Sequence, residues 1–436
     1  MAPRLPPGPR LPKTIQTVAY WNRPTPFFES CRARYGNRFT LRILSVPTFV
    51  QLADPDAARE VFTAPPDVLH PGRGARLLEP VVGASSVILL DEDAHMRQRK
   101  LMLPAFHGEK MRRLADVVTE VAEREVAGWP LGDPVPLHPR LQKLTLEVIL
   151  RAVFGVDPGG RFDALRGHLT NILAVGATPA GMLPVLQRGR RWASFLRARE
   201  ETDALLFELI DERRQAADAE RDDVLEMLLA ARHEDGSPMS NQELRDELMT
   251  LLVAGHETTA SELAWAFERL SRTPAVLRRL TQAVDSDDDE YISATVQETL
   301  RRRPVLPIAA PRYVVEPVEI GGWTYPAGIS LAVNAYLIHH DATIYPDPYT
   351  FKPERFLDEA PGTYTWIPFG GGRRRCLGAS FAQLEMKAVL RAVLIRTELV
   401  PAGDRLEPAR RRGITLSPGS GALTVLRERV REPVAA

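Results

Sequence analysis

The strongest chemical signal in the sequence is a short loop near its C-terminal end, which contains one of only two cysteines. The loop runs from Phe369 to Gly378 and reads FGGGRRRCLG. Three arginines precede Cys376, and apolar residues at helical spacing follow it, so free backbone N–H groups and the positive end of a helix dipole should lie near the sulfur. Both features lower the pKa of a thiol. We therefore expect Cys376 to be a thiolate suited to binding a soft metal ion.

The three consecutive glycines of this loop allow its backbone to approach something large and flat, because a Cβ would collide there or could not adopt a positive φ. A porphyrin fits that description. Two alternatives are a glycine-rich basic turn with a chance cysteine and a nucleotide-binding loop. The second lacks both a Gly-Lys-Ser/Thr ending and a βαβ unit with a following acidic residue.

A long helix is the second element that could position reactive groups. Ser240 and Glu243 form a capping box, and the helical pattern continues to about Ser271, which corresponds to about 45 Å. Gly255 in its middle costs about 1 kcal/mol relative to alanine, and close approach of a ligand would explain that cost. Thr258 can bond back to a carbonyl one turn earlier and bend the helix, which opens a groove for dioxygen and water.

An anion site is suggested by a helix that begins at Asp91. It carries His95 and Arg99 one turn apart on the same face, where the two side chains can grip an anion together. On its own such a pair is more often part of a solvated basic face.

Taken in order along the chain, these segments resemble the motifs of the cytochrome P450 superfamily. The haem-ligand signature of that family matches at five positions of the cysteine loop, namely Phe369, Gly372, Arg374, Cys376 and Gly378. The segment from Ala254 through Gly255 to Thr259 is similar to the oxygen-activation motif, in which an acid and an alcohol, here Glu257 and Thr258, deliver protons. The structural alternative is a kinked core helix with a buried hydroxyl, and His256 is interpreted as a packed or solvated residue.

The resemblance implies further roles for charged residues. His95 and Arg99 match the residues that bind haem propionates in bacterial members, and Arg312 is placed like a further propionate partner. Glu298 and Arg301, three residues apart on a helix, would form a buried structural charge cluster with Arg355.

What the resemblance implies for the whole chain is a mainly α fold with small β-sheets, the cytochrome P450 fold, as a single unit over residues 1–436. The implied cofactor is a b-type haem (heme b, iron protoporphyrin IX) whose iron is held by Cys376. The implied reaction splits dioxygen with two electrons and two protons and inserts one oxygen atom into a hydrophobic substrate. No flavin or iron–sulfur segment occurs within these residues, so electrons are expected from a ferredoxin-type donor with an NAD(P)H-dependent reductase.

Two other functional classes stay open at this point. One is a haem peroxygenase or rearrangement enzyme on the same fold, whose members often lose the acid or the threonine that this chain retains at positions 257 and 258. The other is a non-catalytic haem protein that senses or carries a gas, which would need neither a thiolate nor a proton relay.

Bulk properties favour one large unit in the cytoplasm. No linker or internal repeat divides the chain, and a formal net charge of zero argues against a nucleic-acid partner. Two cysteines give no disulfide framework, which fits a reducing compartment. Residues 1–13 are rich in proline and lack the apolar region of a secretory signal. The apolar stretch from Ile172 to Leu186 is too short for a membrane span, and it is either core or the lid of an apolar pocket.

The remaining pattern predicts where helices and strands lie. A pocket above the haem is expected to be lined by apolar residues, namely Met182, Leu183, Val185 and residues 305–309. The expected elements are strands over 38–44 and 48–52, a helix capped by Asp54, a loop with short helical pieces over 65–90, helices over 141–154, 161–175 and 187–217, strands within 318–333, and a hairpin whose turn is 417–421.

Overall fold

The computed structural model describes residues 5–106, 109–176, 189–216 and 221–430. Most of these residues lie in helices, and the strands form four small sheets. The predicted fold class is therefore confirmed. Within these ranges, no helix combines the length and the apolar character needed to cross a bilayer. The lid residues Met182, Leu183 and Val185 lie outside the described ranges.

The helices fall into short ones near the sheets and long ones that pack on one another. The α-helices are α1 (Lys13–Asn22), α2 (Pro24–Tyr35), α3 (Pro55–Thr63), α4 (Pro71–Ala75), α5 (Glu79–Val82), α6 (Glu92–Met102), α7 (Glu109–Ala127), α8 (Leu137–Val148), α9 (Gly160–Gly176), α11 (Gly189–Gln215), α12 (Val224–Ala230), α13 (Asn241–Ser271), α14 (Pro274–Asp285), α15 (Asp289–Arg302), α16 (Ala335–His339), α17 (Arg355–Asp358) and α18 (Ala379–Arg396). Single turns are η1 (Arg76–Leu78), η2 (Leu103–Phe106), the π-helical η3 (Ile149–Val153) and η5 (Gly372–Arg374).

The largest sheet has five strands in the order β1 (Arg38–Leu41), β2 (Phe49–Leu52), β8 (Ser330–Val333), β5 (Arg312–Val314) and β3 (Leu69–His70). A second sheet has the order β4 (Pro134–Pro136), β12 (Leu423–Glu428) and β9 (Thr397–Pro401). Two hairpins pair β6 (Val318–Ile320) with β7 (Trp323–Tyr325), and β10 (Ala409–Arg412) with β11 (Thr415–Pro418). Only β2 and β8 pair in parallel among these strands.

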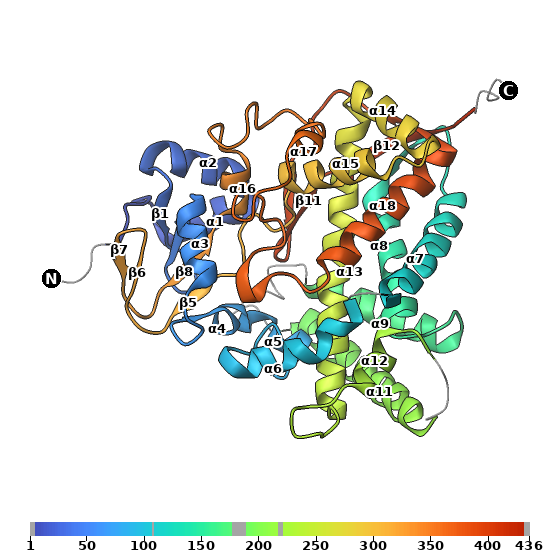
Figure 1. The fold of residues 1–436 in the computed structure, drawn as a ribbon, viewed down its shortest axis with the longest axis horizontal. Helices are drawn as coiled ribbons and strands as arrows, with labels where there is room; N and C mark the ends of the chain where they lie inside the picture. Colours follow the sequence, from blue (N-terminus) through green and yellow to red (C-terminus); the bar gives the residue numbers. More distant parts are fainter. Residues whose placement is uncertain (1–4, 107–108, 177–188, 217–220, 431–436) are drawn as a thin grey trace.

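Helix α13 is the axis of the helical part. Figure 1 shows it running from top to bottom, across the longest axis of the molecule, with α7 and α8 on one side and the N-terminal helices α1 to α3 on the other. Helices α8 and α18 pack against it, and most of its buried apolar residues belong to the largest hydrophobic cluster. The predicted capping box is confirmed, because Ser240 accepts from the backbone of Glu243 and the Glu243 carboxylate accepts from the backbone of Ser240.

The predicted hairpin with its turn at residues 417–421 is wrong. Strand β11 pairs with β10, whereas β12 pairs with β4 and β9 in another sheet. The turn residues do reverse the chain, but the carboxylate of Glu407 fixes the reversal by accepting hydrogen bonds from the backbone of Ser420 and Leu423. A turn motif predicts a reversal and not the strands that will pair. The first predicted strand also ends at Leu41 and not at Leu44.

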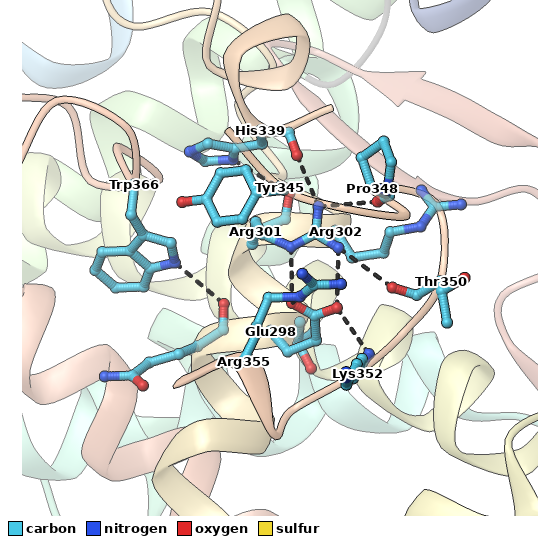
Figure 2. A network of polar contacts seen from close by, with 12 residues as sticks. Glu298, Arg301, Arg302, His339, Tyr345, Pro348, Thr350, Lys352, Arg355 and Trp366 are labelled. Carbon is cyan, nitrogen blue, oxygen red and sulfur yellow. Dashed lines mark hydrogen bonds and ion pairs between the residues drawn. The ribbon is translucent and has the colours of Figure 1, made fainter. Parts of the chain in front are cut away.

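A buried charge cluster joins α15 to the segment that leads into the cysteine loop (Figure 2). The side chains of Glu298 and Arg301 are fully buried, with 2.7 Å between Oε2 and Nε, and Arg355 Nε lies 3.2 Å from the same oxygen. Arg301 also donates to the carbonyls of His339 and Pro348.

His339 extends this cluster toward the cysteine loop. Burial, followed by the charge of Arg301, lowers the pKa of His339 to about 3, so the ring is neutral. Its Nε2 accepts from the backbone N–H of Ile367 at 2.9 Å, which leaves the Nδ1 proton to donate to the carbonyl of Arg301. The three predicted cluster residues are thus brought together, and they anchor the chain just ahead of Phe369.

Substituting Glu298 by alanine should lower the free energy of unfolding by about 3–5 kcal/mol, because the fully buried Arg301 would lose its counter-charge. Asp289→Ala is the control, since its half-exposed carboxylate pairs with Lys387 at the surface and should cost only about 1 kcal/mol. Chemical denaturation measures both values. Equal losses for the two variants would contradict a structural role for the cluster.

Candidate functional site

The cysteine loop is closed by its own backbone. The N–H of Cys376 donates to the carbonyl of Phe369 at 3.0 Å, η5 forms the first half of the loop, and α18 begins three residues after the cysteine. The Cys376 thiol is free and its side chain is accessible. The backbone N–H of Gly378 hydrogen-bonds to the sulfur. The loop therefore presents one accessible sulfur just ahead of a helix N-terminus, as the sequence predicts.

The expected low thiol pKa is not found in the protein chain alone. Burial among protein atoms raises the pKa of Cys376, and this outweighs the lowering by the Gly378 N–H and by the charges of Arg99 and Arg375. The residue is accessible to a ligand although its surroundings desolvate the sulfur. The loop and the helix end thus do not offset the effect of burial on the pKa of the sulfur. A coordinated metal ion would supply the positive charge that the anion needs.

The glycines of the loop serve two different purposes. A Cβ on Gly371 or Gly372 would collide with Phe62 of α3, and Gly372 also has a φ of 61°. These two glycines therefore allow the loop to pack on α3, which corrects the prediction that all three glycines face a flat group. Only Gly370, with a φ of 66°, and Gly378 have no atom within 4 Å of where a Cβ would be. These two positions leave space beside the sulfur-bearing segment.

The middle of α13 presents a partly open face. Ala254 is exposed, and Gly255 and Thr258 are half-buried. The hydroxyl of Thr258 donates to the carbonyl of Ala254 one turn earlier, as predicted. A Cβ on Gly255 would lie 2.8 Å from Cδ1 of Ile149 in η3. The Cβ position of Gly255 therefore faces η3, and the flexible end of the Ile149 side chain would have to shift to admit a Cβ.

Glu257 turns away from that open face and toward α8. Its carboxylate accepts from Gln142 Nε2 at 2.6 Å and from Ser261 Oγ at 3.1 Å, and His138 Nε2 lies 3.3 Å away. Burial raises the pKa of Glu257, but the hydrogen bonds from His138 and Gln142 lower it overall. The acid is therefore an anion within a polar network between two helices.

His256, the residue before Glu257, is packed in the interior, as predicted from the sequence. The ring is buried, its Nδ1 lies 2.8 Å from the hydroxyl of Thr145, and burial lowers its pKa to about 4. It is neutral at pH 7, and its contacts are with α8.

The cations predicted to hold an anion converge from three segments. Burial lowers the pKa of His95 to about 3, and the charges of Arg374, Arg99 and Arg312 add to that effect. Arg312 is buried, and burial followed by the charge of Arg374 lowers its pKa to about 9. The side chains from α6, β5 and the cysteine loop are thus close enough for their charges to shift one another's pKa values. We call these four residues, three arginines and the neutral His95, the cation cluster.

Asp91 is the carboxylate whose charge opposes this cluster. Its Oδ1 lies 2.8 Å from Nη2 of Arg374, and it accepts from the backbone N–H groups of Gly72 and Arg73. Among the described residues, Asp91 pairs with one of the three arginines, Arg374, so the cluster keeps an excess of positive charge. That excess fits a ligand with two carboxylates, such as the two propionates of a haem.

Sequence reasoning missed the segment over residues 85–91, which connects the cysteine loop to α13. Glu247 Oε1 accepts from the backbone of Val87 and from Gln98 on α6, and Thr250 donates to Ser86. Arg374 donates to the carbonyls of Val87 and Leu90. The available signal was Glu247 itself, since it lies one turn before Leu251 on the apolar face of α13, where a charged residue needs a specific partner.

Glu247 should make the stability of the protein depend on pH. Burial raises its pKa from 4.5 to about 8, so the native state keeps a proton that the unfolded chain releases. The free energy of unfolding should therefore fall as the pH rises from about 4.5 to about 8, by up to about 5 kcal/mol for this group. Glu247→Gln preserves the two accepted hydrogen bonds and should flatten that decline.

Unfolding measured between pH 5 and 8, against the exposed control Glu359→Gln, tests this prediction. Glu385 is also buried, and its pKa is raised to about 8. Its contribution to the pH dependence of stability is therefore the same in both variants. A pH dependence that Glu247→Gln leaves unchanged would show that Glu247 is ionised in the native state.

The site combines an accessible cysteine at the start of a helix with buried arginines that outnumber the carboxylates paired with them. This is the arrangement of a haem-thiolate protein. No group of three or more His, Cys, Asp or Glu side chains that could hold a metal ion occurs in the described part of the chain. A porphyrin needs only one such ligand from the protein, so this donor set fits a haem.

Comparison with known proteins agrees with that class. The family model for cytochrome P450 matches residues 3–425. "Putative cytochrome P450 135B1" of Mycobacterium tuberculosis is 42% identical, over 96% of this chain and 90% of its own length. "Putative cytochrome P450 138" of the same species is 39% identical, over 98% and 97%. The chain belongs to the cytochrome P450 family, whose members are in general haem-thiolate monooxygenases.

A solved structure shares the fold across the chain. Retinoic acid-bound cyanobacterial CYP120A1 superposes with a TM-score of 0.83, covering 98% of this chain and 100% of its own, at 23% sequence identity. At that identity the likeness concerns the fold.

Proposed function

We propose that the protein is a monooxygenase that holds a b-type haem (heme b) through Cys376 and hydroxylates a hydrophobic substrate with electrons from a separate donor. The observation that carries the proposal is the excess of buried positive charge in the cation cluster next to a loop with one accessible sulfur. His95, Arg99, Arg312 and Arg374 would bind the propionates. When bound, the haem supplies oxygen activation, and a thiolate ligand favours O–O cleavage.

The remaining assigned residues would shape the cofactor site. Gly378 and Phe369 belong to the loop that carries the sulfur, and Gly372 allows that loop to seat on α3. Ala254 and Gly255 are assigned to the cofactor site from α13, where Ala254 is exposed and Gly255 is half-buried.

Proton delivery is assigned to Glu257 and Thr258. The anionic Glu257 would be protonated through its contacts with Ser261 and His138, while Gln142 holds the carboxylate in place between α8 and α13. The Thr258 hydroxyl uses its own proton in the bond to Ala254, so its lone pairs stay available to accept a hydrogen bond at Oγ1. We propose that Thr258 holds a proton donor in place while Glu257 replenishes it.

Reduced ferredoxin with oxygen, compared with hydrogen peroxide alone, tests the reaction class in a single turnover. The proposal expects product with the first pair and little with peroxide. Product from peroxide alone would favour the peroxygenase alternative, and no product from either would favour a gas carrier or sensor.

Replacing Thr258 by alanine should uncouple electron use from product formation. Without the hydroxyl, reductant is still consumed, but oxygen is diverted to hydrogen peroxide, and product per electron falls several-fold. Thr299→Ala is the control, since Thr299 makes the same bond to a carbonyl one turn earlier, on α15. If Thr258→Ala forms as much product per electron as the parent protein, Thr258 only bends the helix and has no part in proton delivery.

The electron donor is proposed to be an acidic ferredoxin, supplied by an NAD(P)H-dependent reductase. Arg373 and Arg375 flank Arg374 and are exposed, and Arg97 on α6 is exposed as well. Lys100 is exposed and paired with Glu234, and the side chain of Arg112 lies outside the described residues. A cytoplasmic location is proposed with it, supported by Cys31 and Cys376 both being free thiols.

Ferredoxin-supported turnover should slow as ionic strength rises from about 0.1 to about 0.5 M, because salt screens attraction between an acidic donor and these arginines. Arg373→Gln combined with Arg375→Gln should remove most of that salt dependence. Arg427→Gln, an exposed arginine on β12, should not. Turnover that is independent of salt would exclude a basic docking face.

The substrate is proposed to be hydrophobic, such as a fatty acyl, terpenoid or steroid-like compound. Val305 and Leu306 are half-buried and carry no polar side-chain group, whereas Ile308 and Ala309 pack against the sheet-side core clusters. Only the first two are therefore available as pocket lining.

Apolar compounds should shift the haem from low to high spin, with affinity that grows with chain length or ring count at about 25 cal/mol per Å² buried. Leu306→Asp should weaken that binding, and Leu131→Asp, at an exposed leucine after α7, should not. A screen in which small charged molecules bind tightest would reject this substrate class.

A further inference from the structure

Helix α1 has its polar and apolar faces inverted. Gln16 and Thr17 are buried, whereas Ile15 is 49% and Val18 is 59% exposed. Leu11, which precedes the helix by two residues, is 48% exposed. Because residues three apart share one face of a helix, Ile15 and Val18 point to solvent together, and with Leu11 they make up an exposed apolar stripe. Leu44 extends the stripe, since it is 39% exposed and its backbone N–H donates to the hydroxyl of Thr17.

Hydrogen bonds hold the helix in this orientation. The Gln16 amide donates to the carbonyls of Pro9 and Leu11, and its oxygen accepts from the backbone of Arg42. Rotating the apolar stripe inward would leave these groups without partners at a cost for each. The outward direction of the stripe is therefore a fixed property of the fold.

Cations surround the stripe. The first acidic residue of the chain is Glu29, so α1 and the segment before it carry only positive charges. Arg10, Lys13 and Arg42 are exposed, and no ion pair joins them to any carboxylate in the described ranges. With a net charge of zero for the chain, this concentration of positive charge is local.

We propose that this face, composed of Leu11, Ile15, Val18 and Leu44 with Arg10, Lys13 and Arg42, binds the surface of a bilayer that contains anionic phospholipids. Apolar side chains on one face with cations beside them are what an interfacial helix needs to enter the headgroup region. A stable protein interface buries about 800 Å² per partner, from about 20–30 residues a side, and this stripe of four side chains is smaller than that.

Co-sedimentation of the full-length, haem-loaded protein with vesicles tests the proposal. Vesicles of phosphatidylcholine with phosphatidylglycerol should bind it at least tenfold better than vesicles of phosphatidylcholine alone. Ile15→Asp combined with Val18→Asp should abolish that binding. The control is Leu131→Asp, at a leucine 47% exposed that follows α7, and helix α7 lies across the molecule from α1 (Figure 1).

Each outcome has a defined meaning. An unchanged haem absorption spectrum in the double variant shows that the fold is intact, and a single variant, Lys13→Glu, repeats the test without touching the stripe. Absence of binding to the anionic vesicles, or binding that both sets of variants leave unchanged, would overturn the proposal. A dimer in sedimentation velocity that the double variant abolishes would assign the stripe to a second copy of the chain and would overturn it as well.

Discussion

The burial of arginines in excess of their carboxylates is the constraint on which the rest of the site depends. Arg312 and Arg374 are withdrawn from water beside each other, and burial lowers the pKa of both. Buried charge is costly unless it is paired, and Asp91 can pair with only part of it. A dianionic ligand would complete the pairing. The same Asp91 fixes the start of α4 through the N–H groups of Gly72 and Arg73, so the ligand site and the local fold share one carboxylate.

Segments far apart in the sequence have to meet for this cluster to exist. The Glu298 cluster anchors the chain ahead of Phe369, and Gly371 and Gly372 allow the cysteine loop to seat on α3. The segment over residues 85–91 then connects that loop to α13 through Arg374 and Glu247. The site is therefore held by buried hydrogen bonds and ion pairs on three sides.

Local signals in the sequence predicted local outcomes well. The capping box at Ser240, the helix after Cys376 and the backbone bond of Thr258 depend on residues within a few positions of one another, and all three are present. The mainly helical fold followed from motifs in a recognisable order. Errors came from contacts between distant segments. The pairing of β11 and the pKa of Cys376 depend on packing that no local pattern contains.

The central claim is that Cys376 is the axial ligand of a haem, and the absorption spectrum of the ferrous–CO complex tests it most directly. The account predicts that the parent protein shows the red-shifted band of a thiolate ligand. It also predicts that Cys376→His loses this band, whereas a substitution at Cys31, the buried cysteine, keeps it. A red-shifted band that persists in Cys376→His, or that is missing from a parent protein with bound haem, would contradict the account.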